Sequence, residues 1–218
     1  MINYMNLVGA KAKKAYGHKV NTTVKNKVLT KYAQLLEKEK KLILKQNLKD
    51  IGYAKKIGLK DNLVNRLSIN ENKLKDIQNS IIKISKLKDP INNTLEKWKR
   101  SNGLIISKVS IPIGVIGVIY ESRPNVTSDV ATLCFKSGNP VILKGGSEAM
   151  NTNRILVKIF RKALKVNKVD ENYIQFIDSK QRKVVDIMLS DMKKYIDVII
   201  PRGGKNLVKT VQELSKVP

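Results

Sequence analysis

Cysteine, aromatic residues and long apolar runs are all scarce in this chain of 218 residues. The single cysteine, Cys134, excludes an intramolecular disulfide and indicates a reducing compartment. Aromatic residues make up 5% of the chain, so its core must be mostly aliphatic. The longest apolar run, residues 111–120, is about half as long as a membrane span. Because the first residues also lack the apolar segment of a secretory signal, we expect a soluble, cytoplasmic protein with no membrane partner.

Arginine is scarce too, although the chain is strongly basic. There are 43 basic and 18 acidic residues, which gives a formal net charge of +25, and most of the basic residues are lysines. Such a charge raises the question of nucleic-acid binding. The lysines are spread along the whole chain, however, and arginine is the better reader of bases and phosphates. Lysine, asparagine and isoleucine are enriched together, as expected in a protein from an AT-rich genome, because their codons are rich in A and T. We therefore interpret the positive charge as a result of drift in codon composition. A basic nucleic-acid-binding protein stays as an alternative that charge alone supports.

Hydrophobic periodicity divides the chain into two parts. Residues 3–88 carry apolar side chains at helical spacing and predict a helical N-terminal region. After a turn at 89–93 and a strand-like run at 103–109, short apolar runs alternate with helical patterns. The expected strands are 115–120, 140–144, 173–177 and 196–200, with helices at 127–137, after Ser147, at 180–190 and after Gly203. This alternation predicts an α/β fold, a parallel sheet with crossover helices. We place the division between an N-terminal helical region, 1–102, and an α/β region, 103–218.

Glycines and charged residues follow two of the strands, at the edge where parallel sheets bind ligands. The second strand leads into Lys144, Gly145, Gly146, Ser147 and Glu148, and the fourth into Gly203, Gly204 and Lys205. We expect both Gly-Gly pairs to lie at helix N-termini, where backbone N–H groups and the helix dipole favour an anion. One such pair can simply turn the chain, but two at corresponding strand ends favour a nucleotide site. No G-x-G-x-x-G follows the first strand, so the ordinary dinucleotide fingerprint is absent.

Two blocks of the sequence resemble one enzyme family. The stretch IPIGVIGVIYESRPNVTSDVATLCFKSGNPVILKGGSEAMNTN, residues 111–153, and the shorter IIPRGGKNLV, residues 199–208, are similar to gamma-glutamyl phosphate reductases, also called glutamate-5-semialdehyde dehydrogenases. That family belongs to the aldehyde dehydrogenase superfamily, so the resemblance implies an aldehyde-dehydrogenase-like, Rossmann-type sheet. It also implies an oxidoreductase that uses NADPH to reduce L-glutamate 5-phosphate to the semialdehyde and phosphate in L-proline biosynthesis. The implied partners are this small substrate, an upstream glutamate kinase and further copies in a homo-oligomer.

The resemblance assigns cofactor contacts. In the superfamily a lysine at the end of the second strand and a glutamate four residues on meet the adenosine ribose, and these positions match Lys144 and Glu148. The helix that begins at Gly203 matches the one near the cofactor's pyrophosphate. The implied cofactor is NADP(H). The residues alone leave NADP and NAD open, because Lys144 could meet a 2′-phosphate that Glu148 would repel.

The oxyanion donor and the substrate contacts stay open. The superfamily has an asparagine after the first strand that helps to bind the oxyanion. Counting back from Pro124 selects Ser122 for this role, whereas residue type selects Asn125. Arg123 is a candidate for the substrate's carboxylate or phosphate, since a guanidinium can bind such a group through two hydrogen bonds. Helix capping or a salt bridge is the alternative role for Arg123.

The nucleophile implied by the family is a cysteine in the second half of its sequence, which has no counterpart here. Cys134 lies between two large apolar residues in a predicted helix, so we interpret it as a buried hydrophobic residue. We therefore expect a fragment or truncated product: the cofactor-binding half, without the catalytic cysteine domain and inactive alone. A dinucleotide-binding module without catalysis is the alternative. No cluster of histidine, cysteine and carboxylates suggests a metal.

Overall fold

Four parallel strands form the central sheet of the protein. In the computed structural model residues 1–121 and 123–218 are described, so Ser122 lies outside the described residues. The strands, in the order β5-β4-β3-β6, are β3 (Ile116–Tyr120), β4 (Val141–Lys144), β5 (Ile174–Phe176) and β6 (Val198–Arg202). Every neighbouring pair is parallel. The predicted parallel sheet is confirmed, with the last strand displaced by two residues.

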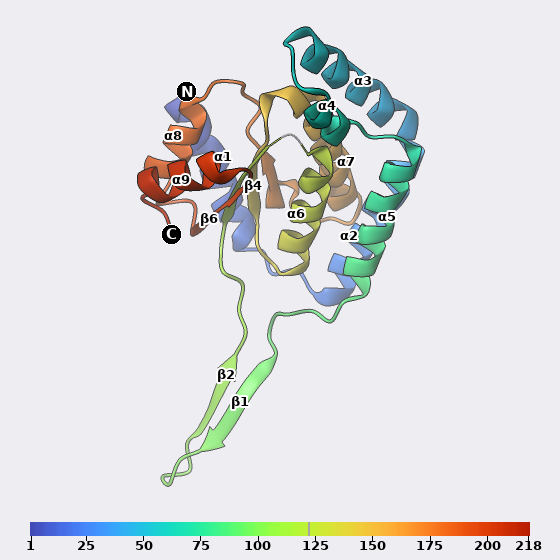
Figure 1. The fold of residues 1–218 in the computed structure, drawn as a ribbon. Coiled ribbons are helices and arrows are strands. Elements are labelled where there is room, and N and C mark those ends of the chain that lie inside the picture. Colours follow the sequence, from blue (N-terminus) through green and yellow to red (C-terminus); the bar gives the residue numbers. More distant parts are fainter. Residues whose placement is uncertain (122) are drawn as a thin grey trace.

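Helices cover both faces of this sheet (Figure 1). One face packs against α1 (Ile2–Tyr16), α8 (Lys183–Ser190) and α9 (Lys205–Leu214), and the other against α2 (Thr22–Lys38), α5 (Glu71–Lys86), α6 (Pro124–Lys136) and α7 (Met150–Val166). The side chains of β3 alternate between the two cores, as strand geometry requires. Val118 and Tyr120 join the core under α2, and Ile119 joins the core under α1. Both faces of the strand are therefore buried.

The N-terminal helices pack on the α/β region. Two of them, α3 (Lys40–Lys56) and α4 (Asp61–Leu67), form a small apolar cluster with Ala149, which precedes α7. They therefore lie at the carboxyl end of the sheet, above α6 and α7 in Figure 1. The predicted helical region is confirmed. None of the helices in the described part of the chain is long and apolar enough to cross a membrane.

The helix predicted at 127–137 begins earlier, at Pro124. Proline suits the first helical position, because that N–H has no partner within the helix and the ring fixes φ at a helical value. Asn125 therefore lies in the first turn of α6 rather than in a loop after the strand. This start places Asn125 on a rigid element.

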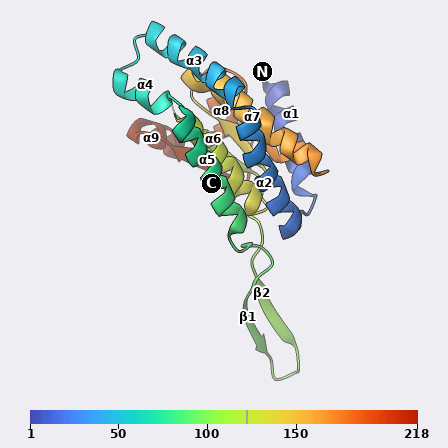
Figure 2. The same cartoon turned by 90° about the vertical axis from the view of Figure 1, so that its right-hand side faces the viewer.

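An antiparallel hairpin projects from the opposite end of the body (Figures 1 and 2). It consists of β1 (Thr94–Lys99) and β2 (Ile105–Val109). The strand-like run at 103–109 is confirmed as β2, but it pairs outside the central sheet. No pattern predicted β1, because all six of its residues are exposed and it has no buried face. The division proposed between residues 102 and 103 falls in the turn of this hairpin and stays a prediction.

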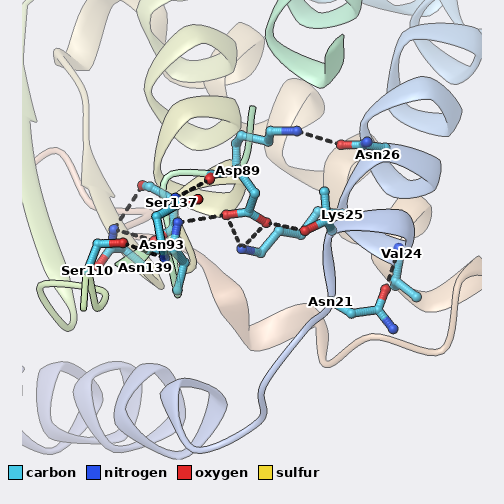
Figure 3. A network of polar contacts seen from close by, with 12 residues as sticks. Asn21, Val24, Lys25, Asn26, Asp89, Asn93, Ser110, Ser137 and Asn139 are labelled. Carbon is cyan, nitrogen blue, oxygen red and sulfur yellow. Dashed lines mark hydrogen bonds and ion pairs between the residues drawn. The ribbon is translucent and has the colours of Figure 1, made fainter. Parts of the chain in front are cut away.

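A buried ion pair holds the segment that enters the hairpin against α2 (Figure 3). The Lys25 ammonium donates to both carboxylate oxygens of Asp89, at 2.9 and 3.2 Å, and the two side chains are 4% and 12% exposed. The Thr22 hydroxyl and the Ile91 backbone N–H donate to the same carboxylate. Burial raises the pKa of Asp89, but these hydrogen bonds outweigh it and lower the pKa below its ordinary value. The base of the hairpin is thus fixed by charge as well as by packing.

Candidate functional site

A cavity of about 330 Å³ opens at the carboxyl ends of β3 and β6. From β3 the chain proceeds to β4 and β5 on one side of the sheet, and it then crosses to β6 on the other side. The crevice between β3 and β6 is therefore the topological switch point, where open α/β sheets bind their ligands. The lining residues come from α4, α6 and the two strand ends: Leu63, Arg66, Glu121, Arg123, Val126, Arg202, Gly203 and Gly204.

A carboxylate already lies at the helix N-terminus in this cavity. The Gly204 backbone N–H, at the start of α9, donates to Oε2 of Glu121 at 3.1 Å. A Cβ at Gly203 would lie 2.6 Å from the carboxyl carbon of Glu121, so glycine is what allows this approach. The N-terminus of α9 thus lies against a carboxylate of the protein itself, and binding of a ligand's anion there stays a prediction. Lys205 is exposed and is the first residue of the helix.

The loop after β4 is more tightly packed. The side chain of Lys144 is buried, and its ammonium donates to the Gly145 carbonyl at 2.7 Å. Burial lowers the pKa of Lys144, and the charge of Glu148 opposes that effect. A Cβ at Gly145 would meet the Tyr120 ring at 2.9 Å as well as the Asn153 amide, so only glycine fits there. Lys144 and Glu148 are the two predicted ribose contacts, and they lie close enough for the charge of Glu148 to act on the pKa of Lys144.

The helix after this loop is capped from another part of the chain. The helix expected after Ser147 does not begin there, because residues Ser147–Ala149 form a single 3₁₀ turn and α7 begins at Met150. The buried carboxylate of Asp50, from α3, accepts hydrogen bonds from the backbone N–H groups of Asn151, at 3.2 Å, and Thr152, at 2.7 Å. These first-turn donors are therefore occupied. The pair Gly145–Gly146 consequently does not open directly onto an α-helix, whereas Gly203–Gly204 does.

A second cavity, of about 600 Å³, adjoins the first and lies between α4, α5 and the start of α6. Its lining residues are Asn65, Arg66, Ser68, Ile69, Lys73, Asp76, Ile77, Ser80, Arg123, Pro124, Asn125 and Asp129. The Asn125 amide donates to the Asp129 carboxylate at 3.1 Å. Two residues, Arg66 and Arg123, line both cavities and form their common wall.

The predicted site residues fall into three groups. Arg123, Gly203 and Gly204 come together around the first cavity, and Asn125 lies in the second. The loop from Lys144 to Glu148 lines neither cavity, and neither does Lys205. Sequence reasoning did not select Arg66, which folding brings to the sheet edge from the N-terminal helices. The only sequence signal for it was the scarcity of arginine itself.

Cys134 is a core residue. It is 7% exposed, within α6, and burial raises the pKa of its thiol to about 12. A reactive cysteine has the opposite environment, with partial exposure and nearby positive charge that lower the pKa. The interpretation of Cys134 as a buried hydrophobic residue is confirmed.

The chain is similar to proteins of a known enzyme family. A family model described as the aldehyde dehydrogenase family matches residues 5–217. The gamma-glutamyl phosphate reductase of Clostridium kluyveri is 44% identical over 199 residues, which are 91% of this chain and 47% of that protein. The gamma-glutamyl phosphate reductase of Syntrophomonas wolfei is 43% identical over 209 residues, 96% of this chain and 50% of that protein. The chain thus spans about half the length of the relatives it matches.

Solved structures give the same result at the level of the fold. The crystal structure of gamma-glutamyl phosphate reductase from Thermotoga maritima matches with a TM-score of 0.95 and 36% identity, over 98% of this chain and 52% of that chain. The Saccharomyces cerevisiae enzyme matches with a TM-score of 0.90 and 30% identity, over 98% and 55%. A propionaldehyde dehydrogenase from Rhodopseudomonas palustris, at 15% identity and a TM-score of 0.72, shares the fold. The chain belongs to the aldehyde dehydrogenase family, and it is similar to about half of a gamma-glutamyl phosphate reductase.

Proposed function

We propose that this chain is the cofactor-binding part of a gamma-glutamyl phosphate reductase. Such an enzyme uses NADPH to reduce L-glutamate 5-phosphate to L-glutamate 5-semialdehyde and phosphate, a step of L-proline biosynthesis. The observation that carries the proposal is the cavity between β3 and β6, where the start of α9 and three arginines surround a space fit for an anion. The names of the relatives supply the substrate, since they are gamma-glutamyl phosphate reductases.

The residues of this cavity fit the diphosphate of a dinucleotide. Gly204 provides a backbone N–H at the positive end of a helix, and Arg202 adds a guanidinium beside it. We assign Gly203, Gly204 and Lys205 to the diphosphate, and the loop from Lys144 to Glu148 to the adenosine ribose. When bound, the cofactor supplies the hydride. The choice of NADP(H) over NAD(H) follows the family resemblance.

The residues of this chain would bind and orient, but they supply no reactive thiol. Reduction of an acyl phosphate in this family needs a thiolate that attacks the acyl carbon. Cys134 is the only cysteine, and its burial and raised pKa keep it protonated and out of reach of a substrate. We therefore expect these 218 residues, taken alone, to show no reductase turnover. For the substrate, Arg123 is the proposed contact with a carboxylate or the phosphate, and Asn125 is the proposed contact with the oxyanion.

The second candidate function is a dinucleotide-binding module without catalysis, and the burial of Cys134 is the observation that favours it. Turnover separates the two. The assay follows NADP-dependent oxidation of glutamate semialdehyde in the presence of phosphate, with this chain alone and with the chain extended through the second half found in its relatives. The reductase proposal predicts activity only for the extended form. Inactivity of a folded extended form that binds NADPH would favour the binding module.

The proposed partners follow from the reaction and from the surface. An acyl phosphate must be made by a kinase acting on glutamate, which places a glutamate kinase upstream. The hairpin of β1 and β2 projects from the body of the protein (Figure 2). Several of its apolar side chains are exposed, among them Leu95, Trp98 and Ile105. Exposed apolar surface of this kind is typical of protein contacts. We propose that a second copy of the chain covers it in a homo-oligomer.

A further inference from the structure

Arginine is rare in this protein, and three arginines converge on one place. The chain has seven arginines and 36 lysines. Arg66, Arg123 and Arg202 line the cavity between β3 and β6, and the first two also line the second cavity. A guanidinium differs from an ammonium in presenting a planar fork of donors that matches a carboxylate or a phosphate. In a chain that uses lysine nearly everywhere else, this clustering indicates a place where the fork is needed.

These three guanidinium groups are free to bind a ligand. Within residues 1–121 and 123–218, their side chains form no hydrogen bond and no ion pair. Arg154 shows the contrast, because its guanidinium donates to both carboxylate oxygens of Asp178, at 2.7 and 2.6 Å. Arg66, Arg123 and Arg202 thus have no protein partner among the described residues, and the same is true of Arg100 and Arg182, which line neither cavity.

The backbone on both sides of Arg66 is held in place. The Lys73 ammonium, from the first turn of α5, donates to the carbonyls of Asn65 at 2.9 Å and Ser68 at 2.7 Å. These two residues flank Arg66 closely, so the end of α4 is tied to α5. The Lys73 ammonium is thus used in structural hydrogen bonds, whereas Arg66 has none among the described residues and lines the cavity.

A carboxylate faces the same cavity. Asp129 is half-buried on α6, and it accepts a hydrogen bond from the Asn125 amide at 3.1 Å. Burial raises the pKa of Asp129 above its ordinary value, although Asn125 and the charge of Arg202 act against the rise. Arg202 is thus close enough for its charge to act on this carboxylate. The wall of the cavity thus contains arginine side chains and a carboxylate that can accept hydrogen bonds.

We propose that the 600 Å³ cavity binds the amino-acid end of the substrate, with Arg66 and Arg123 on its α-carboxylate and Asp129 on its α-ammonium. The inference rests on the function proposed above and deepens it, because it assigns the recognition of a zwitterion to named residues. The volume is within the usual range of small-molecule sites. Arg66 and Arg123 also line the proposed cofactor cavity, so the substrate's other end would extend toward the cofactor.

The test is a titration of the ¹⁵N-labelled chain, followed by NMR through the Nε–Hε signals of its seven arginines. The ligands are L-glutamate, glutarate, which lacks the ammonium, 4-aminobutyrate, which lacks the α-carboxylate, and inorganic phosphate. We expect L-glutamate to shift the signals of Arg66 and Arg123 and to leave Arg182 unchanged. Glutarate and 4-aminobutyrate should each bind about tenfold more weakly, or worse, since each loses one charged contact.

Variants separate the two ends of the zwitterion. Arg66→Lys keeps the charge and loses the fork, so it should weaken L-glutamate and glutarate alike, by about tenfold. Asp129→Asn should weaken L-glutamate by about as much and leave glutarate unchanged. Arg182→Lys and Asp186→Asn are the matched controls, since both residues are exposed and line neither cavity. Both controls should bind all ligands as the wild type does.

Each contrary result would exclude a specific part of the proposed binding site. Equal loss of L-glutamate and glutarate in Asp129→Asn would exclude the ammonium contact. If phosphate shifts the arginines as strongly as L-glutamate, the cavity is a plain anion site and the zwitterion assignment is wrong. If NADPH binds the wild type but L-glutamate does not shift Arg66, the inference fails while the proposed function stands. If neither ligand binds, both fail together.

Discussion

Glu121 and Gly204 are joined across the crevice between β3 and β6. The backbone N–H of Gly204 donates to the Glu121 carboxylate at 3.1 Å, at the positive end of α9. The protein thus places one of its own anions where the diphosphate of a dinucleotide is proposed to lie. Binding of the cofactor there requires the carboxylate to give up this hydrogen bond.

Removing the charge of Glu121 should therefore tighten cofactor binding. We expect Glu121→Gln to lower the Kd for NADPH about twofold to fivefold, the effect of one charge at a helix end. Calorimetric titration at low salt measures the change. Glu213→Gln, an exposed position on the same helix, is the control and should leave the Kd unchanged. An unchanged or higher Kd in Glu121→Gln would show that this carboxylate does not compete with the cofactor.

Lys144 is the proposed ribose contact. Lys144→Ala should weaken NADPH binding by about 1–3 kcal/mol, the cost of a lost charged hydrogen bond. If the ammonium meets the 2′-phosphate, the loss should be larger for NADPH than for NADH, which has no such phosphate. Lys209→Ala, on the exposed side of α9, serves as the control. Unchanged dissociation constants for both dinucleotides would remove Lys144 from the site.

Cys134 should react slowly in the folded protein. Its thiol is buried and burial raises its pKa to about 12, so the thiolate is scarce at pH 8 and also shielded. A disulfide reagent that releases a chromophore should label the native chain slowly and the chain in denaturant rapidly. Rapid native labelling, with a midpoint below the ~8.5 of a free thiol, would restore Cys134 as a candidate nucleophile.

The ion pair at the base of the hairpin should contribute to stability. Lys25→Met leaves the buried Asp89 carboxylate without its partner and should lower the free energy of unfolding by about 3 kcal/mol. Urea unfolding at pH 7 measures the change. Glu213→Gln breaks an exposed pair with Lys209 and should change the free energy by less than about 1 kcal/mol. Equal effects of the two substitutions would contradict a structural role for the buried pair.

The same pair gives stability a pH dependence of known sign. The pKa of Asp89 is lower in the folded protein than in the unfolded chain, so its contribution is complete above an unfolded pKa of about 3.9. It is lost as the pH falls through the lower, folded pKa. The difference in unfolding free energy between wild type and Asp89→Asn should therefore shrink below about pH 4. A difference that stays constant down to pH 2 would show that the charge of Asp89 does not matter.

The sheet could be predicted because its strands are buried on both faces. Such strands, for instance Ile116–Tyr120 and Val141–Lys144, appear in the sequence as unbroken apolar runs between turns. The hairpin strand Thr94–Lys99 gave no such signal, since it is exposed throughout and held by pairing with Ile105–Val109. Hydrophobic periodicity in a sequence reflects burial, so it does not predict a strand whose residues are all exposed.

The site was only partly predictable, for a related reason. Gly203–Gly204 directly precedes α9, so the local sequence was enough to predict the position of this pair at a helix N-terminus. Asp50 caps a helix 100 residues further along the chain, and Arg66 reaches the sheet edge from another helix. Neither contact leaves a local pattern. The sequence shows that arginine is rare. Only the structure shows that three of the seven arginines line one cavity.

The most direct test of the cofactor site is the Kd for NADPH measured by calorimetry in the wild-type chain and in Arg202→Gln. Arg202 lines the cavity between β3 and β6 but not the proposed substrate cavity, so it isolates the cofactor contact. Arg182→Gln, at an exposed position away from both cavities, is the control. Binding by the wild type, a loss of about tenfold or more in Arg202→Gln, and no change in Arg182→Gln are the predicted results. No binding by the wild type, or the same Kd in all three proteins, would contradict the assignment of this cavity to the dinucleotide.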